Sequence, residues 1–153
     1  MIYILFLTFF LNGPQDEMLR LINQERAAFL LPPVAINNEL NKVAMQHAVD
    51  FVENVKTGSG HTWSDGCMET ECTKRKPQEL TNYKAFAYEI AHYHFPEPAN
   101  EMCTPECALK GWNSSPPHYN IIVNNESWRD YKWKSVGIAI YKGYACVWFG
   151  QEF

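Results

Sequence analysis

The chain has 153 residues, of which 46% are hydrophobic and 14% aromatic, and its formal net charge is -4. This length and composition suit one packed domain and exclude an intrinsically disordered chain. The negative charge also argues against nucleic acid as a partner, because the longest basic run, Lys74-Arg75-Lys76, is too short to form a basic surface.

Residues 1–11 are nearly all apolar, and the run ends at residues 12–14, Asn-Gly-Pro. A run this short cannot cross a bilayer, but it has the length of the apolar part of a secretory signal peptide. No Lys or Arg precedes it, and a buried element at the start of the domain is the alternative. We expect residues 1–14 to be a signal peptide and residues 15–153 to be a single extracellular domain without a transmembrane anchor.

Two amphipathic helices are predicted next. Apolar side chains recur on one face of residues 16–29, and a pair of prolines then stops the helix. Asn37 or Asn38 can cap the second helix. The apolar stripe of that helix contains His47, which we interpret as a core histidine satisfied by one hydrogen bond rather than as a ligand.

The middle of the chain has weaker periodicity. Residues 58–83 are expected to form a loop with about one helical turn near Gln78. Residues 85–94 are short and aromatic, and their pattern suits a strand or a helix. Thr104 and Pro105 look like the N-cap and first residue of a further helix.

The clearest β pattern lies near the C-terminus. Apolar side chains alternate along residues 136–141, residues 142–143 make a two-residue turn, and residues 144–149 return. The register places Ile138 opposite Val147 and leaves both faces of the hairpin apolar. A sheet buried on both faces needs helices on both sides, which predicts an α/β/α sandwich.

The five cysteines are Cys67, Cys72, Cys103, Cys107 and Cys146. In an oxidising compartment they would pair, and the odd number leaves one over or pairing between chains. Their close spacing predicts local bridges Cys67–Cys72 and Cys103–Cys107, with Cys146 free and buried in its strand. Without a signal peptide a zinc site would have to be considered, although the chain has no Cys-x2-Cys pair typical of zinc ribbons.

Two N-glycosylation sequons begin at Asn113 and Asn125. We expect Asn125 to be the acceptor, because Asn113 adjoins the segment that we expect to line a cleft.

That segment, residues 112–123, reads Trp-Asn-Ser-Ser-Pro-Pro-His-Tyr-Asn-Ile-Ile-Val. Ser115 before a proline suits an N-cap, which places His118 in the first turn of a short helix. With Trp112 near it, His118 is expected to line a cleft. A Ser–His hydrolase is an alternative, but nothing like Gly-x-Ser-x-Gly surrounds Ser115, and capping explains the serine more simply.

Four stretches, in order along the chain, resemble the CAP superfamily of cysteine-rich secretory proteins, antigen 5 and plant pathogenesis-related proteins, in its short SCP-like form. They are residues 22–40, the Gly-His-Thr of residues 60–62, residues 112–123, and residues 136–153. The resemblance covers nearly all of the expected mature chain. It implies an α+β fold, a three-layer α/β/α sandwich with a small, mainly antiparallel central sheet.

The resemblance also implies that His61, Glu89 and His118 converge in a central cleft. Two departures matter: only the acid of the family's Gly-Glu-Asn-Ile motif is present at Glu89, and Ser115 stands where many members have a second Glu. Two neutral imidazoles can bind zinc or copper, with a carboxylate ligating or orienting a water. The small ligand set supports only weak Zn²⁺ binding by His61 and His118. A buried His–Glu–His hydrogen-bond network is the alternative.

Two classes of function remain open. The first is a secreted, monomeric module that binds a lipid, sterol, protein or divalent metal through His61, Glu89, Ser115 and His118, with no obligatory cofactor. The second is a metal-assisted or acid–base hydrolase of peptidase-like type that uses His61, Glu89 and His118 as catalytic groups. We favour binding, because no nucleophile with an activating base is evident.

Other side chains near the expected cleft have two interpretations each. A set of aromatic residues can wall an apolar groove or simply pack in the core. This set is Trp63, Phe86, Tyr88, Tyr93 and Phe95. His92 and His94 can extend the site, but we interpret them as solvated loop histidines.

Overall fold

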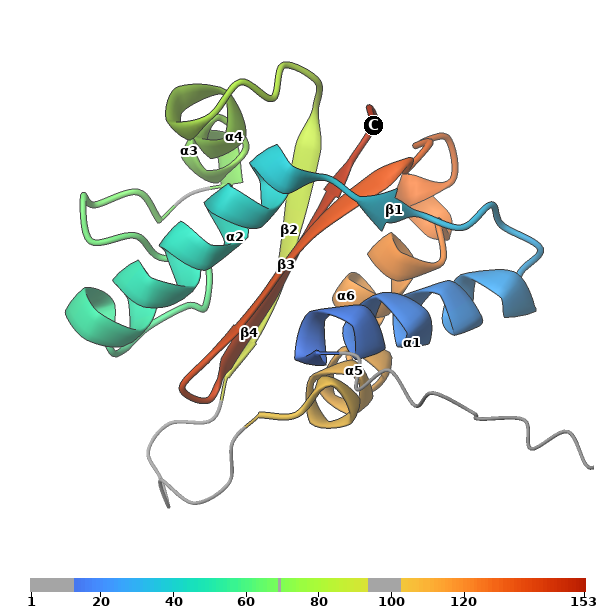
Figure 1. Ribbon diagram of the computed structural model, residues 1–153, viewed down its shortest axis with the longest axis horizontal. Helices are drawn as coiled ribbons and strands as arrows, with labels where there is room; N and C mark the ends of the chain where they lie inside the picture. Colours follow the sequence, from blue (N-terminus) through green and yellow to red (C-terminus); the bar gives the residue numbers. More distant parts are fainter. Residues whose placement is uncertain (1–12, 69, 94–102) are drawn as a thin grey trace, which may run out of the picture.

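The computed structural model of the chain describes residues 13–68, 70–93 and 103–153. The elements are α1 (Pro14–Ala28), β1 (Ala35–Ile36), α2 (Asn38–Asp50), the π-helical turn η1 (Phe51–Val55), α3 (Thr70–Thr73), α4 (Lys76–Leu80), β2 (Ala87–Tyr93), α5 (Pro105–Asn113), α6 (Pro116–Ile122), the 3-10 turn η2 (Glu126–Trp128), β3 (Ser135–Tyr141) and β4 (Tyr144–Gly150). They form three layers. The sheet lies between α2, α3 and α4 on one side and α1, α5 and α6 on the other (Figure 1).

The sheet has four strands in the order β1-β3-β4-β2, with β1 parallel to β3 and the other neighbours antiparallel. The hairpin register pairs Ile138 with Val147, as predicted. The expected α+β sandwich with a small, mainly antiparallel sheet is therefore confirmed. β2 forms one edge of the sheet, and this edge strand carries Glu89.

Each face of the sheet has its own apolar core. Ile138 and Val147 pack with α1, α5 and α6, whereas Cys146 and Trp148 pack against α2 on the opposite face. Burial of each large aliphatic side chain contributes about 1.5–3 kcal/mol, so both helical layers are held by the hairpin. This double burial explains why the hairpin sequence is apolar on both faces.

Helix α2 lies unusually close to β3. A Cβ atom added at Gly137 would lie 2.1 Å from the backbone carbonyl carbon of Leu40, so a larger residue there would push the helix away. Asn37 caps the helix by accepting hydrogen bonds from the backbone N–H groups of Glu39 and Leu40, which confirms one of the two predicted caps. These contacts fix α2, the element that carries His47.

Some boundaries differ from those predicted. Helix α1 begins at Pro14, inside the segment expected to be a signal peptide, and residues 1–12 of that segment lie outside the described residues. Residues 70–80 form two short helices where a loop with one helical turn was expected, and the ambiguous segment around Glu89 is a strand. Within the described ranges, no helix has the length and apolarity needed to span a membrane.

The cysteines follow the predictions in part. Cys146 is a free thiol in its strand, completely buried, as predicted. The expected Cys103–Cys107 disulfide is absent, because the structure holds both residues as thiols beside the start of α5, and their side chains are hydrogen-bonded rather than covalently joined. Cys67 is disulfide-bonded, as predicted. The side chain of Cys72 lies outside the described part of the chain, so the identity of the partner stays a prediction.

Candidate functional site

Glu89 is the centre of the candidate site. It lies on β2 and is 2% exposed. Its Oε1 lies 2.5 Å from Nδ1 of His47 on α2, and its Oε2 lies 2.8 Å from Nδ1 of His61 in the loop after η1. One carboxylate therefore holds two histidines that come from the helix and the loop on the same side of the sheet.

The acceptors around these histidines determine where their protons lie. A carboxylate only accepts, so His47 and His61 both donate to Glu89 through Nδ1. Nε2 of His47 faces a second acceptor, the carbonyl oxygen of Thr62, at 3.1 Å. Trp63 stacks on the His47 ring at a centroid distance of 4.1 Å.

The network shifts the pKa values of its members. Burial alone would raise the pKa of Glu89, but the charge and hydrogen bonds of His47 and His61 lower it to about 2. Burial would lower the pKa of His61, but the hydrogen bond and charge of Glu89 outweigh it and raise that pKa. Glu89 is therefore a carboxylate across the physiological pH range, and its role is to accept.

Helix α6 places His118 opposite His61, with 6.3 Å between the ring centroids. Nδ1 of His118 lies 2.9 Å from the hydroxyl oxygen of Ser115. Burial, followed by the positive charge of His61 and His92, lowers the pKa of His118, which favours the neutral ring at neutral pH. Each of the two facing histidines is thus held by a hydrogen bond at Nδ1.

Ser115 differs from its predicted role in one respect. It is the N-cap residue of α6, as expected, but its hydroxyl makes no capping hydrogen bond. Its carbonyl accepts from the backbone N–H groups of His118 and Tyr119, while its hydroxyl bonds the His118 ring. The side chain therefore orients the histidine, and capping does not explain it.

A cleft of about 390 Å³ opens beside β2 and is lined by His61, Glu89 and His118. A smaller cavity of about 150 Å³ shares His61 and Glu89. Tyr88 and Trp128, with 4.4 Å between their ring centroids, line the larger cleft. The residues expected to converge do lie together, along the edge strand of the sheet.

The aromatic walls are only partly those expected. Tyr88 lines the cleft, but Trp63 stacks on His47, and Phe86 packs against Tyr131 and Trp133. Tyr93 packs against Phe51 at the start of η1, and Phe95 lies outside the described residues.

Sequence reasoning missed two members of the site. Trp128 enters the cleft from the turn after α6, and no local pattern marked it. His47 is a buried core residue, as predicted, but it is also the partner of Glu89. The sequence did place His47 on the apolar stripe of α2 that faces the sheet, and this position was the signal that it could contact a residue of a strand.

His92 is also placed differently from the prediction. It is the sixth residue of strand β2 rather than a solvated loop histidine, and its ring lies against Gly111 of α5. His94 lies outside the described residues. Since side chains alternate along a strand, His92 faces away from Glu89 and does not extend the His–Glu cleft.

Both glycosylation sequons begin at exposed asparagines. However, Glu126 and Ser127 of the second sequon line the cleft, whereas Asn113 does not line it and donates from Nδ2 to Glu25 at 3.0 Å. The reason for preferring Asn125 over Asn113 is therefore wrong. Glycosylation itself stays a prediction at both positions.

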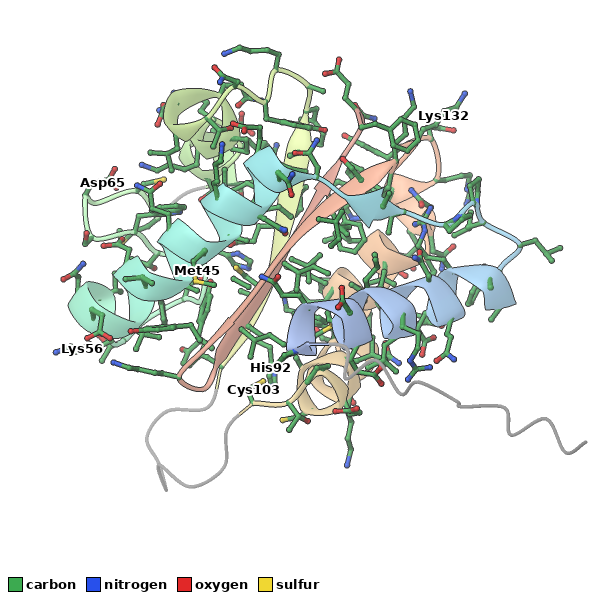
Figure 2. All side chains as sticks on the ribbon, viewed as in Figure 1. Met45, Lys56, Asp65, His92, Cys103 and Lys132 are labelled. Atoms are coloured by element: carbon green, nitrogen blue, oxygen red, sulfur yellow. The ribbon has the colours of Figure 1, made fainter. Side chains whose placement is uncertain are left out.

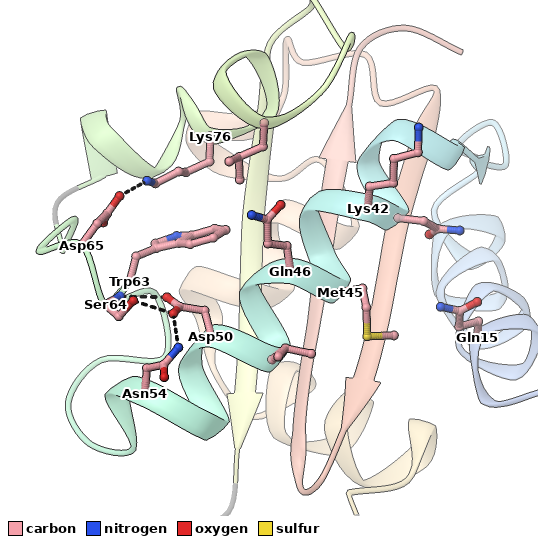
Figure 3. Close-up of a pocket in the computed structure, with 13 residues that line it drawn as sticks. Gln15, Lys42, Met45, Gln46, Asp50, Asn54, Trp63, Ser64, Asp65 and Lys76 are labelled. Carbon is pink, nitrogen blue, oxygen red and sulfur yellow. Dashed lines mark hydrogen bonds and ion pairs between the residues drawn. The ribbon is translucent and has the colours of Figure 1, made fainter.

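A larger cavity of about 880 Å³ lies on the outer side of α2 (Figure 3). Met45 and Gln46 of α2 line it together with Trp63, and Asp65 pairs with Lys76 at its rim. Its lining contains none of the histidines of the candidate site and lacks Glu89. The histidines and Glu89 therefore belong to the cleft of about 390 Å³ and not to this cavity.

Residues 19–153 match the family model CAP, described as the cysteine-rich secretory protein family. This chain belongs to that family. A search of curated proteins found no match.

Solved structures show the same fold. An extracellular protein with an SCP domain from Bacillus anthracis is 19% identical over 92% of this CAP chain and 41% of its own, with a TM-score of 0.68. An outer surface protein from Borrelia burgdorferi is 17% identical over 92% and 93% of the two chains, with a TM-score of 0.67. A cysteine-rich secretory protein from Staphylococcus aureus is 16% identical over 91% and 38%, with a TM-score of 0.60.

At these identities the likeness establishes the fold alone. This CAP chain also spans only 41% and 38% of the Bacillus and Staphylococcus proteins.

Proposed function

We propose that this CAP domain is a secreted, monomeric binding module whose His–Glu cleft holds a ligand, with a weakly bound divalent metal ion between His61 and His118. The observation that carries the proposal is that both rings are fixed at Nδ1, by Glu89 and by Ser115, and face each other across the cleft. A metal-binding histidine typically has one nitrogen held in this way, which orients the other toward the ion.

The metal site is a weak one in this proposal. Two imidazoles that share a tetrahedral ion at Zn–N bonds of about 2.0–2.1 Å have ring centroids roughly 5 Å apart, so the two rings, now 6.3 Å apart, would close by about 1 Å on binding. Two protein ligands are fewer than the three or four of ordinary zinc sites, so the ion exchanges readily. Glu89 acts through His61, because both of its oxygens already accept hydrogen bonds from histidine.

The cleft walls favour an amphipathic ligand such as a lipid or sterol. The cleft volume of about 390 Å³ is in the range of small-molecule sites. Tyr88 and Trp128 offer an apolar wall, while the histidines and Asn120 offer polar partners. Such a ligand would place its apolar body against Tyr88 and Trp128 and its polar head group at the histidines.

Extracellular location is part of the proposal. The apolar run at residues 1–11 favours export, and the Bacillus and Borrelia proteins of this fold are described as extracellular and outer-surface proteins.

Zinc titration calorimetry tests the metal site. The titrations use a Cys107→Ser background, so that thiols near α5 do not contribute. His61→Ala or His118→Ala should abolish measurable binding to the cleft, Glu89→Gln should weaken it less, and Ser115→Glu should tighten it by adding a third ligand. The exposed Glu53→Gln variant is the control and should bind as the parent does. If both histidine variants bind zinc as the parent does, the metal site is wrong and the His–Glu–His hydrogen-bond network has only a structural role.

Ligand binding is tested with a fluorescent sterol and a fluorescent fatty acid. Trp128→Ala should weaken capture about tenfold by removing one wall. A change of Met45 to Ala, in the cavity outside α2, should have no effect. Equal capture by both variants would place the ligand elsewhere.

One observation favours the alternative, a hydrolase. Glu89 holds Nδ1 of His61 as a carboxylate orients a general base. Ser115 bonds His118 instead, so it is not paired with this base. Peptide or ester hydrolysis that is lost in both His61→Ala and Glu89→Gln would favour an enzyme.

A further inference from the structure

A second cluster of metal-ligating side chains lies on the other face of β2. The imidazole of His92 and the sulfurs of Cys103 and Cys107 offer ligand atoms that all lie within 4.8 Å of one another. Figure 2 shows His92 near the end of β2 beside Cys103, which precedes α5. The cluster shares no residue with the His–Glu cleft.

The start of α5 fixes the two sulfurs. Thr104 is the N-cap, and its hydroxyl accepts from the backbone N–H of Cys107 at 3.2 Å. Pro105 occupies the first helical position. Cys103 therefore lies just before the helix, 2% exposed, and Cys107 lies one turn inside it, half-buried.

Gly111 lets the imidazole reach this helix. It lies one turn after Cys107, and a Cβ atom added there would be 2.3 Å from Cε1 and 2.4 Å from Nδ1 of His92. The strand, the helix start and this glycine thus hold one nitrogen and two sulfur ligands in a single small space.

The donor atoms of the cluster have the chemistry of a cation site. Burial, with a further contribution from Cys107, raises the pKa of the Cys103 thiol to about 12, so two thiolates do not form there unaided. A bound divalent ion reverses this, because a thiol that coordinates it is deprotonated. Two sulfurs and one imidazole form a donor set suited to zinc.

We propose that His92, Cys103 and Cys107 bind one Zn²⁺ ion, with the fourth position open to water or an external ligand. Tetrahedral bonds of about 2.3 Å to sulfur and 2.0–2.1 Å to nitrogen place ligand atoms roughly 3.5–3.8 Å apart. The cluster therefore closes by only about 1 Å on loading. His92 and Cys107 are half-buried, so the ion can reach the site from solvent. Once bound, the ion links β2 to α5, and the two thiols lose their protons as they coordinate it.

This site does not depend on the proposed function of the cleft. It excludes the Cys103–Cys107 disulfide, because the bridge would consume two of its three ligands.

Cobalt substitution of the reduced full chain tests the site. One equivalent of Co²⁺ should produce thiolate-to-cobalt charge-transfer bands, and Zn²⁺ should displace them. Cys107→Ser should remove these bands while the protein stays folded, since this side chain is only half-buried. His92→Gln and Gly111→Ala should each weaken Co²⁺ binding at least tenfold with both thiols intact, the second by displacing the imidazole.

Two control variants separate this site from the others. Cys146→Ser, which changes the buried thiol on the α2 side, and His61→Ala, which changes the cleft, should both keep the charge-transfer bands. Unchanged bands in Cys107→Ser, or no thiolate band in the reduced parent, would overturn the proposal. A Cys103–Cys107 disulfide found by non-reducing peptide mapping of the secreted protein would overturn it as well.

Discussion

At the scale of single residues, the pairing of Glu89 with two histidines decides the chemistry of the cleft. A carboxylate buried alone would be protonated, but here it is ionised because His47 and His61 donate to both oxygens. The same contacts raise the pKa of His61 above its ordinary value of 6.5. The protonation of the cleft is therefore set by a residue that is itself almost inaccessible.

The raised pKa of His61 predicts how zinc binding depends on pH. Imidazole must be neutral to ligate, so affinity should fall as pH drops, with a midpoint above 6.5. Glu89→Gln removes the charge that raises this pKa and should move the midpoint down, besides weakening binding. Zinc calorimetry over a pH series in the Cys107→Ser background measures both. An unshifted midpoint in Glu89→Gln would contradict the assigned cause.

The lowered pKa of Glu89 predicts acid destabilisation. A carboxyl with a folded-state pKa below its ordinary 4.5 adds stability that is complete above 4.5 and is lost as pH falls through about 2. The free energy of unfolding should therefore drop across this window, by at most about 3 kcal/mol from this group. Glu89→Gln should flatten the drop, and the control, exposed Asp130→Asn, should not. Urea denaturation between pH 2 and 5 provides the measurement.

At the scale of elements, buried polar side chains join helices that are far apart in the sequence, in addition to the packing of the two apolar cores. Arg26 on α1 is 1% exposed, and its Nη1 donates to the carbonyl of Ile122 and to Asn124, both at 2.8 Å. Its Nε donates to the carbonyl of Pro32 at 3.0 Å. The guanidinium therefore joins the end of α1 to the end of α6, the helix that carries His118.

Loss of Arg26 should destabilise the fold. Arg26→Ala leaves buried carbonyl groups without donors and should lower the free energy of unfolding by about 3 kcal/mol. Arg26→Lys should restore part of this, since it keeps the charge but not the planar donors. The exposed, ion-paired Arg20→Ala variant on the same helix should cost much less, because solvent screens its pair with Glu17. Chemical denaturation compares the three, and equal losses for Arg26→Ala and Arg20→Ala would refute this role.

At the scale of the whole molecule, the edge strand of the three-layer domain contributes residues to both the cleft and the proposed zinc cluster. The side chains of β2 alternate between the two faces of the sheet, so Glu89 points toward α2 and His92 points toward α5. The cleft and the proposed zinc cluster are thus neighbours that share a strand but no ligand.

The placement of α1 bears on processing of the chain. Because this helix begins at Pro14 with Gly13 as its N-cap, signal cleavage that preserves the helix and its cap should leave a mature N-terminus no later than Gly13. N-terminal sequencing of exported protein tests this, and a chain that begins at Met1 would contradict it.

The sequence by itself determined those helices and strands in which buried and exposed side chains alternate with a regular period. The hairpin register, the two-faced sheet and the caps at Asn37 and Thr104 follow from alternation and from backbone chemistry within a few residues. The order of the family motifs also indicated that His61 and His118 would meet.

Only the tertiary structure decided which distant side chains became partners. His47 and Glu89 are 42 residues apart, and their contact depends on how α2 docks on the sheet at Gly137. The grouping of His92 with Cys103 similarly depends on packing of α5 against β2. Short-range patterns report which face of an element is buried, but only long-range packing determines what lies opposite, and the chemistry of both sites depends on those opposite residues.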